Sequence, residues 1–192
     1  FEQNKGRRAV VVGKPNPVNQ ERFLGHVKEI LDTGIFTNDG PFVKQLEERV
    51  SCYTGTKHAI AVSNATVGIE LALRALDLRP GGEVIVPSFT FIATSHAVVA
   101  AGLTPVFCDV DRTTHLITVD HIRAALTDKT IAIIGVNLWG LMCEPDVEEF
   151  AAAISVPILF DSAHSFGSID SLGRTSGNMG TVEIFSLHAT KL

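Results

Sequence analysis

Two side chains near the end of the sequence have the types and positions that chemistry on a carbonyl cofactor requires. Lys191 ends the segment 185–191 (FSLHATK), and Asp161 follows an apolar run at 157–160. A lysine amine can form an imine with an aldehyde, and a carboxylate carried by an apolar strand is costly unless a cation such as a protonated pyridine nitrogen pairs with it. The pair indicates a pyridoxal phosphate site, in which Lys191 would also move protons. Taken singly, Lys191 could be a surface lysine, and Asp161 could cap a helix or pair with an arginine.

A strand-to-helix turn at 63–66 (SNAT) has the features of a phosphate site. The first turn of a helix offers free N–H groups and the positive end of its dipole, and the Thr66 hydroxyl would add a donor. Ser186, which leaves the last strand, could donate to the same phosphate. Taken alone, this pattern is a weak signal, and an ordinary helix cap by Ser63 or Asn64 is the better explanation of the turn.

Aromatic residues and a histidine complete the cluster. Phe89 and Phe91 follow Pro87, and they would point the same way if the strand geometry continued; a ring there could stack on a planar cofactor or pack in the core. His164 comes three residues after Asp161, which could support a metal, but no third ligand has suitable spacing. We therefore predict no metal site.

The elements that must position these residues follow from the periodicity of apolar side chains. It predicts helices at 20–33, around 42–50, and at 66–76, 92–101, 119–126 and 146–153. It predicts strands at 58–62, 83–86, 105–110, 131–136, 157–160 and 182–185.

Strands that are apolar throughout and alternate with helices predict an α/β fold: a mostly parallel sheet covered by helices on both faces. Such sheets bind ligands beyond the carboxyl ends of their strands. The polar clusters follow strands in this chain, at 63–66, 87–91, 137–140 and 161–164. They should therefore meet at one edge, where a single site could use them all.

Composition narrows the function classes. The 192 residues suffice for one substantial domain, and a net charge of −5 with scattered signs argues against nucleic-acid binding. No apolar run reaches the length of a membrane span, and nothing resembles a signal peptide. The three cysteines form no CxxC pair, so neither zinc nor a disulfide framework is indicated. We expect a cytoplasmic protein with reduced thiols.

Several motifs in order resemble the sugar aminotransferase family named DegT/DnrJ/EryC1/StrS, within the fold-type I class of pyridoxal phosphate enzymes. The resemblance runs from about Asn16 to the last residue. It includes the segments 37–41, 63–66, 87–94, 105–111, 160–164 and 185–191.

The resemblance implies roles for the cofactor residues. Lys191 would hold pyridoxal phosphate as an imine, and Asp161 would pair with the pyridine nitrogen. Phe91 would stack on the ring, and His164 would lie near its 3-oxygen. The phosphate would be held by Ala65 (through its backbone), Thr66 and Ser186.

The implied reaction moves an amino group from an amino acid, usually glutamate, to a keto group of a nucleotide-linked deoxysugar, in surface-polysaccharide or antibiotic biosynthesis. Pyridoxamine phosphate would form in the first half and be consumed in the second. The segment 138–140 and the final motif are most similar to members that act on 4-keto-6-deoxy sugars. Asn137 stands where close relatives would have histidine. The residues near the substrate would be Thr37, Asn38, Asn137 and Trp139.

The resemblance also implies what surrounds this chain. We expect residues 1–15 to be a tail and 16–192 to be an incomplete cofactor-binding large domain, with a C-terminal small domain and a homodimer partner in the longer protein. Two alternatives stay open. One is a sugar dehydratase of the same family, against which Lys191 argues because those members carry histidine there. The other is a catalytically incomplete fragment or non-enzymatic partner of a full-length relative.

Overall fold

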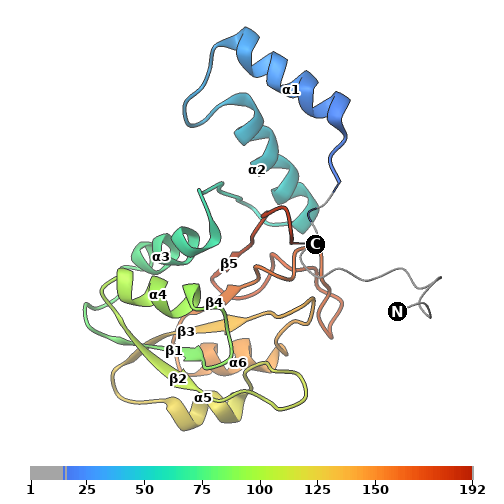
Figure 1. The fold of residues 1–192 in the computed structure, drawn as a ribbon. Coiled ribbons are helices and arrows are strands. Elements are labelled where there is room, and N and C mark those ends of the chain that lie inside the picture. Colours follow the sequence, from blue (N-terminus) through green and yellow to red (C-terminus); the bar gives the residue numbers. More distant parts are fainter. Residues whose placement is uncertain (1–14, 16, 192) are drawn as a thin grey trace, which may run out of the picture.

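The computed structural model describes residue 15 and residues 17–191 (Figure 1). Its helices are α1 (Gln20–Thr33), α2 (Pro41–Thr54), α3 (Ala65–Ala75), α4 (Ala93–Ala100), α5 (Val119–Ala125) and α6 (Asp146–Ala153). Its strands are β1 (Glu83–Pro87), β2 (Thr104–Cys108), β3 (Thr130–Val136), β4 (Ile158–Asp161) and β5 (Val182–Ile184).

The strands form one parallel sheet in the order β2-β1-β3-β4-β5. From β1 the chain crosses to β2 on one side, then returns past β1 to β3 and continues to β4 and β5. Right-handed crossovers that run in opposite directions place their helices on opposite faces of the sheet. Figure 1 shows this result, with α3 and α4 on one face and α5 and α6 on the other. The order reverses between β1 and β3, where a crevice at the carboxyl edge is expected.

The core lies on both faces of this sheet. The central residues of β1 and β3 are fully buried, as expected for parallel strands covered on each side. A helix and a strand can approach closely where a glycine has no side chain between them. A Cβ on Gly68 would lie 3.1 Å from Ile184, so this glycine lets α3 pack directly on β5.

The sequence-based fold class is confirmed: the sheet is parallel, and helices cover both faces. The predicted helices and most predicted strands are present, with ends that differ by a few residues. The predicted strand at 58–62 is wrong. This segment has no strand assignment, Ile60 is 81% exposed, and no neighbouring strand among the described residues pairs with it. An apolar run becomes a strand only where a neighbour accepts its backbone hydrogen bonds.

Helices α1 and α2 form a pair that stands off from the sheet (Figure 1). Asn19 caps α1 through its side chain, and Gly34 ends the helix with a φ of 65°. Pro41 then starts α2, where a missing N–H costs nothing. None of the residues of α1 is buried, so its apolar face is open to solvent.

The predicted tail, residues 1–15, lies outside the described residues except for residue 15. The division of the chain into tail and domain therefore stays a prediction.

Candidate active site

Asp161 is the buried centre of the polar cluster at the carboxyl edge of the sheet. It is the last residue of β4, between the switch point and β5, and is 6% exposed. The Thr94 hydroxyl donates to its Oδ2 over 2.9 Å, and the Ala163 N–H donates to its Oδ1 over 3.2 Å. Both donors are neutral. The carboxylate is thus held firmly, with lone pairs left for a further partner.

Burial dominates the electrostatics of this carboxyl group. Removal from water raises the pKa of Asp161, while the hydrogen bonds from Thr94 and Ala163 and the charges of His164 and Lys191 oppose that rise. The net effect is a raised pKa, so the charged form lacks stabilisation. A cationic partner bound at the free lone pairs would supply it.

Lys191 and His164 meet beside Asp161. The Lys191 Nζ is hydrogen-bonded to the His164 Nε2, across 27 residues of sequence. Burial lowers the pKa of His164, and the nearby charge of Lys191 lowers it further, while Asp161 acts in the opposite direction. A neutral imidazole can accept the proton of an ammonium, so the structure places a proton acceptor on the lysine amine.

The amino end of α3 has two unused donors. Asn64 caps the helix by accepting the Val67 N–H over 3.0 Å, so the capping interpretation of this turn holds. The cap does not exclude an anion site, however. In the described part of the chain no acceptor bonds to the N–H groups of Ala65 and Thr66, which remain available at a helix N-terminus.

Aromatic residues follow the carboxyl ends of β1 and β3. Strand β1 ends at Pro87, so the alternation proposed for Phe89 and Phe91 does not apply. Phe91 is 72% exposed. Phe89 instead packs against Trp139 and His115, with ring centroids 5.9 and 5.0 Å away.

Trp139 and Asn137 follow β3 but face different surroundings. Trp139 is 64% exposed and has a φ of 52°, so its ring is presented to solvent from a strained turn. Asn137 is 1% exposed: its amide donates to the Ser162 hydroxyl over 2.8 Å, and its carbonyl accepts the Cys143 N–H over 2.7 Å. The contact predicted between Asn137 and a substrate stays a prediction; its side chain is occupied inside the fold, where it supports the turn that carries Trp139.

No hydrogen bond of the described residues joins the remaining predicted site residues to Asp161. Ser186 is half-buried, and its hydroxyl accepts the His188 N–H over 3.4 Å. Thr37 and Asn38 are exposed in the α1–α2 connection, at the end of α2 that lies away from the sheet (Figure 1). No hydrogen bond or ring contact of the described residues joins that connection to Asp161.

Sequence reasoning missed two polar groups, the buried Thr94 and the half-buried Glu183. Thr94 belongs to one of the motifs but received no role, although a threonine on a helix face with Ala97 and Val98 signals a buried partner. Glu183 accepts from the Ser162 hydroxyl over 2.6 Å, and burial raises the pKa of this glutamate despite that bond. Its position in a short strand gave no such signal.

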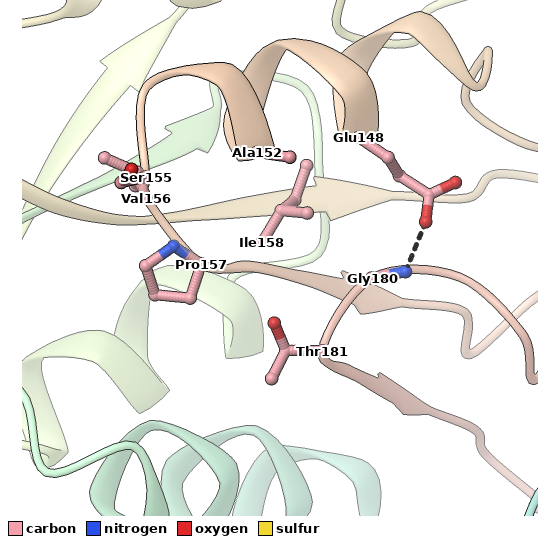
Figure 2. A pocket seen from close by; sticks show the side chains of 8 residues that line it. All are labelled: Glu148, Ala152, Ser155, Val156, Pro157, Ile158, Gly180 and Thr181. Atoms are coloured by element: carbon pink, nitrogen blue, oxygen red, sulfur yellow. Dashed lines mark hydrogen bonds between the residues drawn. The ribbon is translucent and has the colours of Figure 1, made fainter.

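A surface hollow lies at the amino edge of the sheet, opposite Asp161. Figure 2 shows it between α6 and the amino ends of β4 and β5. Its one carboxylate, Glu148, already accepts the Gly180 N–H over 2.6 Å. Nothing there resembles the polar cluster at the carboxyl edge. Within the described residues, no group of histidine, cysteine, aspartate or glutamate is arranged for a metal ion, and no helix is long and apolar enough to cross a membrane.

A parallel α/β sheet with a buried aspartate, a lysine with a proton acceptor and a free helix N-terminus defines the class of fold-type I cofactor-binding domains. Residues 17–192 match the DegT/DnrJ/EryC1/StrS aminotransferase family, and the chain belongs to that family. This confirms the resemblance inferred from the motifs.

Solved structures agree with this assignment. DesI, determined in the presence of its TDP-sugar product, is 42% identical with a TM-score of 0.85, covering 95% of this chain and 46% of DesI. An aminotransferase from Psychrobacter cryohalolentis is 35% identical with a TM-score of 0.85, covering 93% and 45%. Spr1654 of Streptococcus pneumoniae, a putative sugar aminotransferase in its PMP form, is 33% identical with a TM-score of 0.82, covering 95% and 49%. The chain therefore spans about half the length of these relatives.

Proposed function

We propose that the protein from which this chain comes is a pyridoxal phosphate-dependent aminotransferase that acts on a nucleotide-linked keto-sugar. One observation carries the proposal: a buried carboxylate that accepts hydrogen bonds from two neutral donors lies beside a lysine whose amine contacts a histidine. A protonated pyridine nitrogen would be a suitable cationic partner for this carboxylate, and the residues around Asp161 fit that group. DesI was solved with a TDP-sugar product and Spr1654 in a PMP form, which supports the same substrate and cofactor class.

Each residue would then have a defined task. Lys191 would hold the cofactor covalently and move a proton between carbon atoms, with the proton acceptor His164 at its amine. Asp161 would keep the pyridine nitrogen protonated, and Phe91 would cover one face of the ring. When bound, pyridoxal phosphate would supply an electron-withdrawing ring that stabilises negative charge at the reacting carbon.

The phosphate and substrate contacts complete the proposal. The free N–H groups of Ala65 and Thr66 and the Ser186 hydroxyl would bind the phosphate. Thr37, Asn38, Asn137 and Trp139 would lie near the sugar nucleotide. Because Thr37 and Asn38 stand away from Asp161 here, they would serve either another copy in a homodimer or this site after a rearrangement. The amino donor would be an amino acid, with glutamate as our first choice, and the sugar a 4-keto-6-deoxyhexose.

Borohydride reduction of the full-length natural protein tests the proposal. We expect a phosphopyridoxyl adduct on Lys191 by peptide mapping, none in Lys191→Ala, and transamination at least about 10²-fold slower in that variant. Lys57→Ala, a change at an exposed lysine, is the matched control. Absence of any adduct in the natural protein would refute the cofactor assignment.

Two other outcomes would favour a different function. Adduct formation without amino transfer to any keto-sugar nucleotide would favour a non-enzymatic partner. Loss of a hydroxyl group from the sugar, with no amine gained, would show a dehydratase, against which Lys191 argues.

A further inference from the structure

Thr94 has a buried hydroxyl that donates to one specific acceptor. It lies in the first turn of α4 and is 0% exposed, on the helix face that also buries Ala97 and Val98. Its hydroxyl donates to the Asp161 Oδ2 over 2.9 Å, across 67 residues of sequence. A polar group on an otherwise apolar buried face is stable only with such a partner.

The direction of this hydrogen bond fixes a second one. The Thr90 and Thr94 hydroxyls lie 2.8 Å apart, and either could be the donor by distance alone. Thr94 has a single hydroxyl proton, and that proton goes to Asp161, so Thr90 must donate to Thr94. The result is a chain in which each bond polarises the next towards the carboxylate.

The same turn also carries the aromatic ring assigned to the cofactor. The Thr94 N–H donates to the carbonyl of Phe91 over 3.1 Å. One residue therefore ties the backbone of Phe91 and the side chain of Asp161 together. The spacing between a ring-stacking group and a ring-nitrogen partner is thus set by Thr94.

We propose that Thr94 is a positioning residue that aims the Asp161 carboxylate at the pyridine nitrogen and fixes its distance from Phe91, with Thr90 as its support. The proposal rests on the proposed function for the identity of the nitrogen. Thr94 itself contacts no reacting atom. Two donors hold this carboxylate: the Ala163 N–H at Oδ1 over 3.2 Å comes from the backbone, and the Thr94 hydroxyl at Oδ2 over 2.9 Å comes from a side chain and can be removed by substitution.

The test compares Thr94→Val with Thr94→Ser in the full-length natural protein. Valine keeps the shape but removes the donor, whereas serine restores it. Ser95→Ala is the matched control, because the Ser95 hydroxyl on the same turn donates only to the backbone carbonyl of Ile92. Thr90→Val probes the second bond and, being farther from Asp161, should act in the same direction with a smaller effect.

Two measurements are made on each variant. The first is the dissociation constant of pyridoxal phosphate by absorbance titration. We expect about tenfold weaker binding for Thr94→Val, near wild-type binding for Thr94→Ser, and no change for Ser95→Ala, since a hydrogen bond to a charged group is lost only in the first.

The second is the pKa of Asp161 in the cofactor-free protein, by carbon NMR of the side-chain carboxyl. This pKa should rise further in Thr94→Val, because the charged form of Asp161 loses a donor. This readout needs neither activity nor cofactor. If the natural protein fails to bind pyridoxal phosphate, the proposed function falls while the NMR result still decides the coupling. An unchanged pKa and an unchanged dissociation constant in Thr94→Val, with Thr90→Val also unchanged, would overturn the role of Thr94.

Discussion

At the scale of single residues, Asp161 is a group whose charge the fold does not fully stabilise. Its burial raises its pKa more than the donors and the charges of His164 and Lys191 lower it. In the cofactor-free protein, the Asp161 carboxylate therefore binds a proton more tightly in the folded state than in the unfolded chain. The pKa of an unfolded aspartate is about 3.9. Stability from Asp161 is present below that value and is lost as the pH rises through the folded-state pKa.

Asp161→Asn should remove this pH dependence. The difference in unfolding free energy, wild type minus variant, should fall by about 1.4 kcal/mol for each pH unit between the two pKa values. Urea denaturation of cofactor-free protein from pH 4 to pH 8 measures it. A flat difference would contradict the predicted shift.

Asp170→Asn serves as the control of opposite sign. Burial raises the pKa of Asp170, but the hydrogen bonds from the Arg174 N–H and side chain and from the Leu172 N–H outweigh it and lower that pKa. Its stability contribution is present at higher pH and is lost as the pH falls through the folded-state pKa. The wild-type-minus-variant difference for Asp170→Asn should therefore increase with pH below about 3.9, the value of an unfolded aspartate, and should be flat above it.

The sequence alone predicts Lys191 and Asp161 as site residues, because their residue types and the apolar run before Asp161 carry chemical information. It could not identify the contact between Thr94 and Asp161. Those residues are 67 positions apart and meet only because the sheet order places β1 and β4 on either side of β3. It also could not foresee that Asn137 uses its whole amide inside the fold.

At the scale of elements, the contact between β3 and β4 determines where Asp161 lies. Gly135 in β3 pairs with Phe160 in β4, and a Cβ on Gly135 would lie 2.5 Å from the Phe160 ring. Phe160 is 0% exposed and cannot move aside. The glycine thus allows the two strands to pack while the next residue of β4 reaches the site.

Gly135→Ala should destabilise the protein by about 1–3 kcal/mol through overpacking and should weaken cofactor binding by displacing Asp161. The urea midpoint should fall with an unchanged m-value. Gly25→Ala makes the same change within α1, where nothing lies within 4 Å, and should be neutral or stabilising by up to about 1 kcal/mol. Equal stability of the two variants would show that the β3–β4 contact yields easily.

Element prediction succeeded where local pattern and environment agree. Residues 84–86 and 131–136 are apolar, and each segment lies between two strands, so pattern and structure coincide. Residues 58–62 have a similar pattern but no neighbouring strand among the described residues. The Ala61 N–H donates instead to a side chain, the Glu47 Oε1, over 2.7 Å. The periodicity of apolar residues indicates a preference for burial, but it does not indicate whether a partner strand is present.

At the scale of the whole molecule, apolar surface is exposed where α1 and α2 stand off from the sheet (Figure 1). The chain as it stands leaves this surface in water, in a pattern that monomeric proteins rarely show. The exposed apolar side chains of this pair and its connection are Phe23, Leu24, Leu31, Ile35, Phe36, Leu46 and Tyr53.

The 192-residue chain prepared by itself should therefore self-associate. We expect a size-exclusion mass above that of the 20.6 kDa monomer at micromolar concentration, together with binding of a hydrophobic dye. Leu24→Glu with Leu31→Glu, two changes one heptad apart on the 63% and 62% exposed face of α1, should shift the chain towards the monomer. Lys28→Glu changes the charge of the same helix without removing apolar area and should leave the association in place. A monomeric, dye-free wild-type chain would mean that α1 and α2 fold back onto the sheet in solution, which would also bring Thr37 and Asn38 nearer to Asp161.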